Sequence, residues 1–336
     1  MNGKSNLSWR IGMIMMLLCA ALVMAVFPVA ADYTADKPLT EYKNGTITGD
    51  MNYTIGNSSY SPKIWSNNTN NIYVAALPQN VPSGATVVEA RLYEYFTWSY
   101  DDDAKTGVSP LMTVTFDGTS FNNPSASYTD TKGSGTYNYP SGTYCYNVTN
   151  LINSSSTTDH IVTVHNRASP DCNISFNSQA IGLVVVYNAS GSNVTKHYWI
   201  DEGCDMLNCR WNTNLDPDAW DYGGITPENA TAIANFSNVN NYGIDSAYLI
   251  TTVPSGGTLT GGQAYNKLFF NNANWTSIWD GNPRDSNFSW ENTSISCYDI
   301  QSGLNIAKFR DGWDSNTHYT DGQMQAANAF LVITYS

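Results

Sequence analysis

The chain has 336 residues, with 28 acidic and 15 basic side chains and a formal net charge of −13. A field of this sign argues against nucleic acid as a partner and attracts cations, although solubility alone also explains it. The composition is rich in Asn, Ser, Thr, Tyr and Gly and poor in the best helix formers, which excludes a largely helical or disordered protein and predicts an all-β fold.

The first 31 residues have the layout of a secretory signal peptide. Lys4 and Arg10 precede an apolar run over residues 11–27, and Val29 and Ala31 supply the small residues that a signal peptidase requires. A retained signal-anchor helix is the alternative. Cleavage leaves 13 basic and 28 acidic residues, a net charge of −15. No later apolar run reaches the roughly 20 residues that cross a bilayer, so we expect a secreted, extracellular protein at the cell surface without a membrane span.

An internal repeat organises the rest of the chain. Four sequence landmarks occur twice in the same order: residues 90–93 and 247–250, 112–118 and 267–272, 145–148 and 297–300, and 183–187 and 331–335. Such an order is typical of tandem duplication with loop insertions. The repeat predicts a signal peptide over residues 1–31, a first domain over 32–193 and a second over 194–336.

Within each half the strand signal has a period of two. Leu92 and Phe96 fall on one face, predicted to be buried, while Arg91 and Tyr93 fall on a face predicted to be wet or half-covered. The aliphatic runs that end each half are expected to be central strands covered on both sides. Strands separated by Asn-, Gly-, Pro- and Ser-rich turns predict two tandem antiparallel β-sandwiches of jelly-roll type.

These strand patterns resemble a family of uncharacterised extracellular β-domain proteins of archaea, especially methanogens. The resemblance rests on Gly49-Asp50, Ile55-Gly56-Asn57, Ala90-Arg91-Leu92-Tyr93, Thr97-Trp98, Leu183-Val184-Val185-Val186-Tyr187 and Ile200-Asp201-Glu202-Gly203-Cys204-Asp205. It implies an adhesin-like, surface-layer or sheath protein, and no catalytic residues accompany it.

Acceptor sites for N-glycosylation are about twice as frequent as chance predicts. The fourteen asparagines are Asn44, Asn52, Asn57, Asn67, Asn147, Asn153, Asn173, Asn188, Asn193, Asn229, Asn235, Asn274, Asn287 and Asn292. A composition selected for a hydrated surface would give a similar excess, and both interpretations place the chain outside the cell.

Five cysteines remain after the signal peptide, so not all can pair within the chain. In an oxidising compartment we expect disulfides between Cys204 and Cys209 and between Cys145 and Cys172. Cys297 is left as a buried free thiol or an interchain bond.

No constellation for enzyme chemistry stands out. The four histidines form no HExxH pair, and the sequence has no Gly-x-Ser-x-Gly elbow or phosphate-binding glycine loop. Carboxylates cluster in turn-like sequence, where solvated loop acids are one explanation and calcium ligation is another. The calcium candidates are Asp216, Asp218 and Asp221, and no other cofactor is expected.

The sequence therefore predicts a non-enzymatic structural protein of the cell envelope, such as a surface-layer, sheath or filament subunit. A homo-oligomer or self-assembling lattice is the expected partner state, with other envelope proteins or glycans as further partners. The alternative is a carbohydrate-binding or adhesin module that uses loop tryptophans, since exposed aromatic faces stack on sugars. Its candidate residues are Trp211, Trp220, Trp275, Trp279, Trp290 and Trp313.

Overall fold

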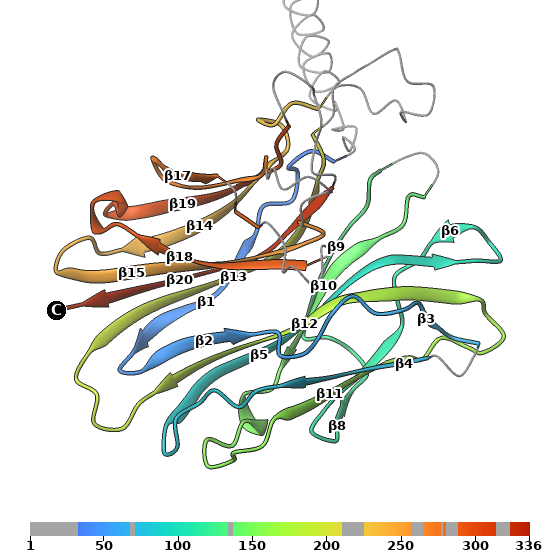
Figure 1. The fold of residues 1–336 in the computed structure, drawn as a ribbon, viewed down its shortest axis with the longest axis horizontal. Coiled ribbons are helices and arrows are strands. Elements are labelled where there is room, and N and C mark those ends of the chain that lie inside the picture. The colour runs from blue at the N-terminus through green and yellow to red at the C-terminus, as the bar shows by residue number, and fades with distance from the viewer. Residues whose placement is uncertain are drawn as a thin grey trace, which may run out of the picture. The chain divides into compact units, whose positions relative to one another are not determined.

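The structure is a computed structural model that describes residues 33–67, 71–133, 137–209, 225–256, 265–276, 278–279, 288–313 and 323–336. The chain divides into Met1–Ala31 and Asp32–Ser336, and the expected signal peptide lies outside the described residues. Regular structure in the described part consists of antiparallel β-strands and two short 3-10 turns, η1 (Thr149–Leu151) and η2 (Cys297–Asp299) (Figure 1). The all-β, sandwich-like fold class is therefore confirmed. None of the described segments is a helix with the length and apolarity of a membrane span.

The strands form four antiparallel sheets. The first outer sheet is β4 (Ile72–Leu77), β11 (His160–Asn166), β7 (Met112–Phe116) and β8 (Thr119–Phe121). The first central sheet is β2 (Asp50–Thr54), β12 (Ile174–Asn188), β5 (Thr86–Asp101), β10 (Ser141–Asn147) and β9 (Ala126–Asp130), joined by β3 (Ile64–Trp65) and β6 (Thr106–Gly107). The second central sheet is β1 (Thr40–Ile47), β13 (Thr195–Leu207), β20 (Met324–Tyr335), β15 (Ile244–Pro254) and β18 (Phe288–Ile295). The second outer sheet is β14 (Thr231–Val239), β19 (Gly303–Arg310), β16 (Lys267–Phe270) and β17 (Ala273–Thr276).

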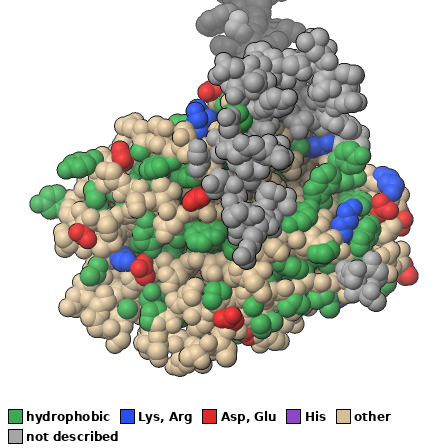
Figure 2. Space-filling model, in the orientation of Figure 1, with side chains coloured by type: hydrophobic (Ala, Val, Ile, Leu, Met, Phe, Trp, Pro, Cys, Tyr) green, Lys and Arg blue, Asp and Glu red, His purple; other side chains and the backbone are tan. Residues whose placement is uncertain are grey.

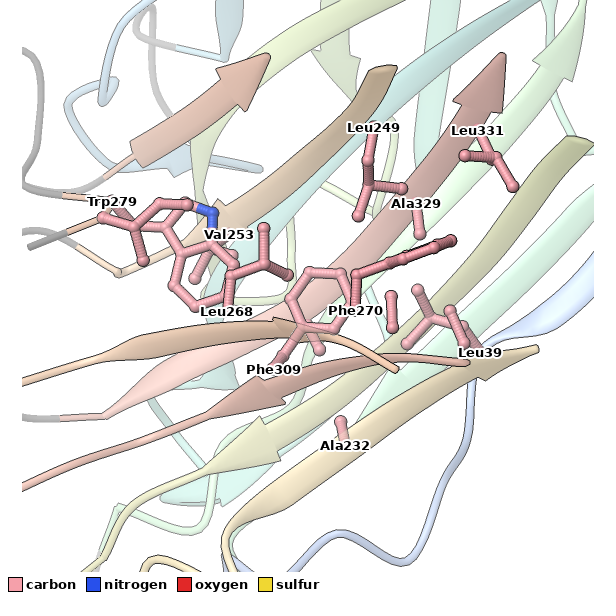
Figure 3. Close-up of a cluster of buried hydrophobic side chains, with 14 of the residues drawn as sticks. Leu39, Ala232, Leu249, Val253, Leu268, Phe270, Trp279, Phe309, Ala329 and Leu331 are labelled. Atoms are coloured by element: carbon pink, nitrogen blue, oxygen red, sulfur yellow. The ribbon is translucent and has the colours of Figure 1, made fainter. Parts of the chain in front are cut away.

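Each outer sheet packs on the central sheet of its own half. In the first half, Phe96 of β5 and Val114 of β7 belong to one hydrophobic core. In the second half, Leu331 of β20 shares a core with Phe309 of β19, and the Trp279 ring stacks on Phe309 (Figure 3). Alternating side chains of the two facing sheets fill each core, as in a β-sandwich.

A third core lies between the two central sheets. Tyr93, Tyr95 and Val184 of the first half pack there with Ile200 and Phe330 of the second half. The central strands β12 and β20 are consequently buried along almost their whole length, which confirms the expectation that the aliphatic runs are covered on both sides. Continuous apolar runs are typical of strands with two buried faces.

The expectation of a wet second face on β5 is wrong. Tyr93 and Tyr95 are completely buried, and Arg91 is 1% exposed. The period-two pattern correctly identified the face that meets the outer sheet. The other face carries tyrosines and charged groups, and this composition indicated contact with solvent. It packs instead against the second central sheet, where the polar groups find hydrogen-bond partners.

The two halves share a strand order. The orders β2-β12-β5-β10 and β4-β11-β7-β8 in the first half correspond to β13-β20-β15-β18 and β14-β19-β16-β17 in the second. A 3-10 turn follows β10 in one half and β18 in the other. The predicted boundary between residues 193 and 194 falls in the connection from β12 to β13.

Strand β1 does not stay with the half in which it occurs in sequence. It pairs antiparallel with β13, from Thr40 opposite Glu202 to Ile47 opposite Lys196. The N-terminal segment before it runs along β14, since the Leu39 amide donates to the Ile233 carbonyl at 2.9 Å. The segment from Leu39 to Ile47 therefore belongs structurally to the second sandwich and adds a further link between the halves.

Candidate metal centre

Three carboxylates from distant parts of the chain converge where the N-terminal segment meets both central sheets. Asp36 precedes β1, Asp130 ends β9 and Asp205 lies in β13. One ligand oxygen of each lies within 4.8 Å of those of the other two. Asp36 is exposed, whereas Asp130 and Asp205 are buried. The group thus opens to solvent on one side only.

An irregularity in β13 aims Asp205 at this point. Glu202 pairs with Asn328 of β20, but the next pair is Asp205 with Ala326, so two residues of β13 oppose one of β20. Such a bulge changes which face of the sheet the following side chains occupy. Glu202 and Asp205 are three residues apart and would face opposite ways in a regular strand. Because of the bulge, both contact the first central sheet.

Asp130 is held firmly by its neighbours. Lys37 donates from Nζ to Asp130 Oδ1 at 2.6 Å, and the Thr131 amide donates to the same oxygen at 2.8 Å. The Met206 amide donates to Oδ2 at 2.8 Å. Burial raises the pKa of Asp130, and the Lys37 hydrogen bond opposes that rise. Two strands and the N-terminal segment are therefore tied to one carboxylate.

Asp205 is the unsatisfied member of the group. It is completely buried, and neither carboxylate oxygen accepts a hydrogen bond from the residues that the structure describes. Burial raises the pKa of Asp205 to about 8, and the charges of Asp130 and Asp36 add to the rise. The backbone N–H groups of Lys37 and Asp36 act in the opposite direction without reaching hydrogen-bond geometry. A buried carboxylate without a partner costs free energy, which a bound cation would relieve.

The charges and distances suit a divalent ion with oxygen ligands. Three ionised carboxylates and the Lys37 ammonium sum to a charge of −2, which one divalent cation neutralises. Calcium–oxygen bonds of about 2.3–2.6 Å place oxygens on opposite sides of the ion roughly 5 Å apart, close to the observed spread. Zinc is less suited, because its protein sites are dominated by histidine and thiolate ligands. Asp36, Asp130 and Asp205 would be the ligands.

The calcium site expected from sequence involves other residues. Asp216, Asp218 and Asp221 are outside the described residues, so that prediction stays a prediction. Asp205 lies close in sequence to Asp201 and Glu202, but its partners at residues 36 and 130 carry no local signal. No motif spacing links three residues so far apart in sequence.

The disulfides expected from sequence stay predictions. Cys145 lies in the core between the central sheets, whereas Cys172 is half-buried outside that core. Cys204 lies at the bulge near Asp130, and Cys209 belongs to the core on the other side of the second central sheet. Cys297 is a half-buried free thiol that donates to the Asp245 carbonyl at 3.7 Å.

The candidate tryptophans that the structure describes do not form a shared exposed surface. Trp279 is completely buried, and Trp275 and Trp313 pack against the same core. Trp290 is 36% exposed and contacts Tyr53 edge-on. Trp211 and Trp220 lie outside the described residues.

The described glycosylation candidates lie at exposed or half-buried positions. Asn287 lies outside the described residues, and none of the other thirteen sequon asparagines is buried. The buried asparagines of the described part lie outside every Asn-x-Ser/Thr motif, and they are Asn166, Asn177, Asn208, Asn266, Asn305 and Asn328. The sequons are therefore accessible as a class.

Comparison with known families gives one match that spans nearly the whole described chain. The model of the family described as "Protein of unknown function (DUF3344)" matches residues 32–334. This agrees with the expectation of a single family over most of the mature chain, while kinship with archaeal surface-layer or sheath proteins stays a prediction. No curated protein matches the sequence.

Three solved structures show weak likeness. PNGase F, a glycosylasparaginase from Flavobacterium meningosepticum, matches with 10% identity and a TM-score of 0.27, covering 85% of this chain and 96% of its own. A peptide-N(4)-(N-acetyl-β-D-glucosaminyl) asparagine amidase matches with 10% identity and a TM-score of 0.25, covering 87% and 96%. The VP2 subviral particle of infectious bursal disease virus matches with 10% identity and a TM-score of 0.18, covering 92% and 76%.

Two of these three are enzymes, and this finding contradicts the expectation of a non-enzymatic structural protein of the envelope, which we therefore withdraw. The accompanying expectation that the chain is not an enzyme is not confirmed. Likeness at these TM-scores transfers neither an activity nor a substrate to this chain.

Proposed function

The chain belongs to the DUF3344 family of proteins of unknown function, and we propose that it is a secreted protein that binds calcium through Asp36, Asp130 and Asp205. The carboxylate of Asp205 carries the proposal, because it is completely buried, has no hydrogen-bond partner in the described part of the chain and lies close to two further carboxylates. Without a bound ion, this carboxyl group either stays protonated or destabilises the fold through its buried, unpaired charge. A calcium ion supplies the missing partner.

Bound calcium would tie together three parts of the fold. Asp36 belongs to the N-terminal segment, Asp130 to the first central sheet and Asp205 to the second. An ion that binds the folded chain and not the unfolded chain stabilises the fold by mass action, by about 2.7 kcal/mol at a concentration 100 times its Kd. The proposed role of the ion is to stabilise the contacts among the N-terminal segment and the two sandwiches.

Isothermal titration of calcium into the mature protein tests this proposal. We expect one site with a Kd on the order of 10⁻⁴ M, as in extracellular calcium modules. Asp205→Asn should abolish binding, since an amide replaces the central carboxylate at nearly the same volume. Asp103→Asn is the matched control, because Asp103 is an exposed acid of the β5–β6 turn and should leave binding unchanged.

Circular dichroism shows whether each variant keeps its fold, so loss of binding is separated from loss of structure. Equal calcium affinity in the wild type and Asp205→Asn would contradict the proposal. So would the absence of binding by the wild type at millimolar calcium.

We also propose that the protein is exported from the cell and carries N-linked glycans. This proposal is supported by the signal-like residues 1–31 and by the exclusion of sequon asparagines from the buried positions. Mass spectrometry of the native protein should find a mature N-terminus at Asp32 and glycopeptides from the accessible sequons. An intact Met1 N-terminus with unmodified sequon peptides would contradict secretion and glycosylation together.

A further inference from the structure

The second outer sheet carries a group of basic residues on its solvent face. Strand pairing sets Arg310 of β19 directly opposite Lys267 of β16, and Lys308 opposite Phe269. The alternating residues of both strands point into the core, so these four side chains share the outer face. We name Lys267, Lys308, Arg310 and Phe269 the basic face.

The flanking strands complete two cross-strand rows. The first row is Thr231, Arg310, Lys267 and Thr276, and the second is Ile233, Lys308, Phe269 and Asn274. Leu304, 52% exposed, lies further along β19. The face thus combines cations, hydroxyl groups and apolar area in a flat arrangement.

The two lysines of this face lack partners. Neither Lys267 nor Lys308 forms an ion pair or hydrogen bond within the described part of the chain. Arg310 lies over the Phe269 ring at 4.6 Å and donates to Glu228 at 3.4 Å, and Glu228 is 70% exposed. Among the described residues, three cations and one carboxylate give this face a net charge of +2.

Folding does not require this arrangement. Like charges directly opposite each other on neighbouring strands destabilise a sheet. The corresponding sheet of the first half has the same strand order, and its outer face carries Ile72, Val74, Ile161, Thr163, His165 and Thr115, with no lysine, arginine or acid among them. Charged side chains are also sparse and scattered in the view of Figure 2. The opposed cations destabilise the second outer sheet and do not serve its fold. This favours a role for the basic face in binding a partner molecule.

We propose that the basic face binds the acidic surface of a second copy of this chain. The chain has a formal net charge of −13, so its own surface is the complementary one. The basic face cannot pair with itself, because two such faces repel. The contact is therefore heterologous, head to tail, and association continues beyond a dimer unless the rotation closes a ring. This inference is independent of calcium binding.

Sedimentation velocity of the mature protein over a range of concentrations tests the contact. We expect species that grow with concentration and shrink with added salt, since pairing between exposed charges is screened. Lys267→Glu with Lys308→Glu should weaken association roughly tenfold or more, because repulsion replaces attraction. Lys267→Arg with Lys308→Arg keeps the charges and should associate like the wild type.

A second control separates the effect of total charge from the effect of position. Lys105→Glu, at an exposed lysine of the β5–β6 turn, changes the net charge by as much as Lys267→Glu alone and should leave association unchanged, whereas Lys267→Glu alone should weaken association. Each protein is also prepared with Asn274→Gln, because Asn274 is a glycosylation candidate at the rim of the face. A glycan there would otherwise change the result.

Zero-length cross-linking of wild-type protein needs no variant. In a mixture of isotopically light and heavy chains, carbodiimide should join Lys267 or Lys308 of one copy to a carboxylate of another and give mixed-isotope peptides. A protein that stays monomeric at every concentration, or whose association ignores the charge reversal, overturns the proposal. Monomers that instead bind an acidic polysaccharide through the same lysines also overturn it.

Discussion

Arg91 of β5 and Glu202 of β13 form a buried bidentate ion pair between the two central sheets. Arg91 donates from Nε to Oε1 at 2.9 Å and from Nη2 to Oε2 at 2.8 Å. The Tyr93 hydroxyl donates to Oε1 at 3.0 Å, and the guanidinium lies 3.9 Å from the centre of the Tyr42 ring. Both side chains are buried, so each charge is compensated by a residue of the other half of the chain.

Glu202→Leu should destabilise the protein by about 3–5 kcal/mol, because Arg91 is left buried with its charge uncompensated. Replacing both residues at once, as Arg91→Met with Glu202→Leu, should cost less than Glu202→Leu alone. Urea unfolding of Arg91→Met, Glu202→Leu and the double variant measures the coupling. The exposed pair Lys105 and Asp102 serves as a control, and its removal should give no measurable change. A double variant as unstable as the sum of its singles would contradict this interpretation.

Sequence could predict the central strands but not what covers them. The runs ending in Tyr187 and Tyr335 are continuously aliphatic, and only a strand buried on both faces needs such a run. For β5 the alternation identified one buried face. The hydroxyl groups of Tyr93 and Tyr95 need hydrogen-bond partners, so the sequence indicated a face in contact with water. The structure supplies partners from the other half of the chain. Tyr95 donates to Asn328 at 2.6 Å, across 233 residues of sequence.

The candidate metal site could be predicted only in part. Asp205 lies in a visible acidic cluster, and the adjacent Gly203 is compatible with a bulge. The bulge itself depends on the pairing with β20, which sequence does not reveal. Asp36 and Asp130 are isolated acids in their own segments and meet Asp205 only through the packing of the central sheets. Cysteine pairing is hard to predict for the same reason, since spacing along the chain does not say which side of a sheet a cysteine faces.

Asp201 should make stability depend on pH. Burial raises its pKa to about 8, while the Asn235 amide, donating to Oδ2 at 3.1 Å, opposes the rise. The neutral form is favoured in the folded protein, so its stabilising contribution is complete below about pH 4 and is lost as the pH rises toward 8. The slope is at most roughly 1.4 kcal/mol per pH unit.

Asp201→Asn should remove most of this slope, because the amide stays neutral at every pH. Urea unfolding of both proteins between pH 4 and pH 9, with chelator present throughout, compares the two slopes. Parallel curves for wild type and variant would show that Asp201 is ionised in the folded protein at all of these pH values.

Calcium should slow amide hydrogen exchange in the N-terminal segment. The Lys37 side chain is 45% exposed and is held by Asp130 and by the Thr129 carbonyl, beside the proposed ligand Asp36. Local opening of this segment governs exchange of the Leu39 amide, which donates to the Ile233 carbonyl, and an ion that binds only the closed form reduces that opening. The Leu39 amide should therefore exchange several-fold faster with chelator than with calcium. The Asp103 amide, in the β5–β6 turn, should exchange at the same rate in both conditions, and Asp205→Asn should make the Leu39 rate independent of calcium.

Gly182 of β12 should not tolerate a side chain, because Tyr53 of β2 packs directly over it. A Cβ atom at this position would lie 2.4 Å from the Tyr53 hydroxyl oxygen and 2.9 Å from its Cε2. The ring cannot move freely, since its hydroxyl shares a 3.1 Å hydrogen bond with Tyr95 and its face meets Phe330 in the core between the central sheets. Gly182→Ala should therefore destabilise the protein by about 1–3 kcal/mol in urea unfolding. In a Tyr53→Ala background the same change should cost little, because the space above the glycine is then open. An equal cost in both backgrounds would mean that the backbone of β12, and not the tyrosine ring, excludes the methyl group.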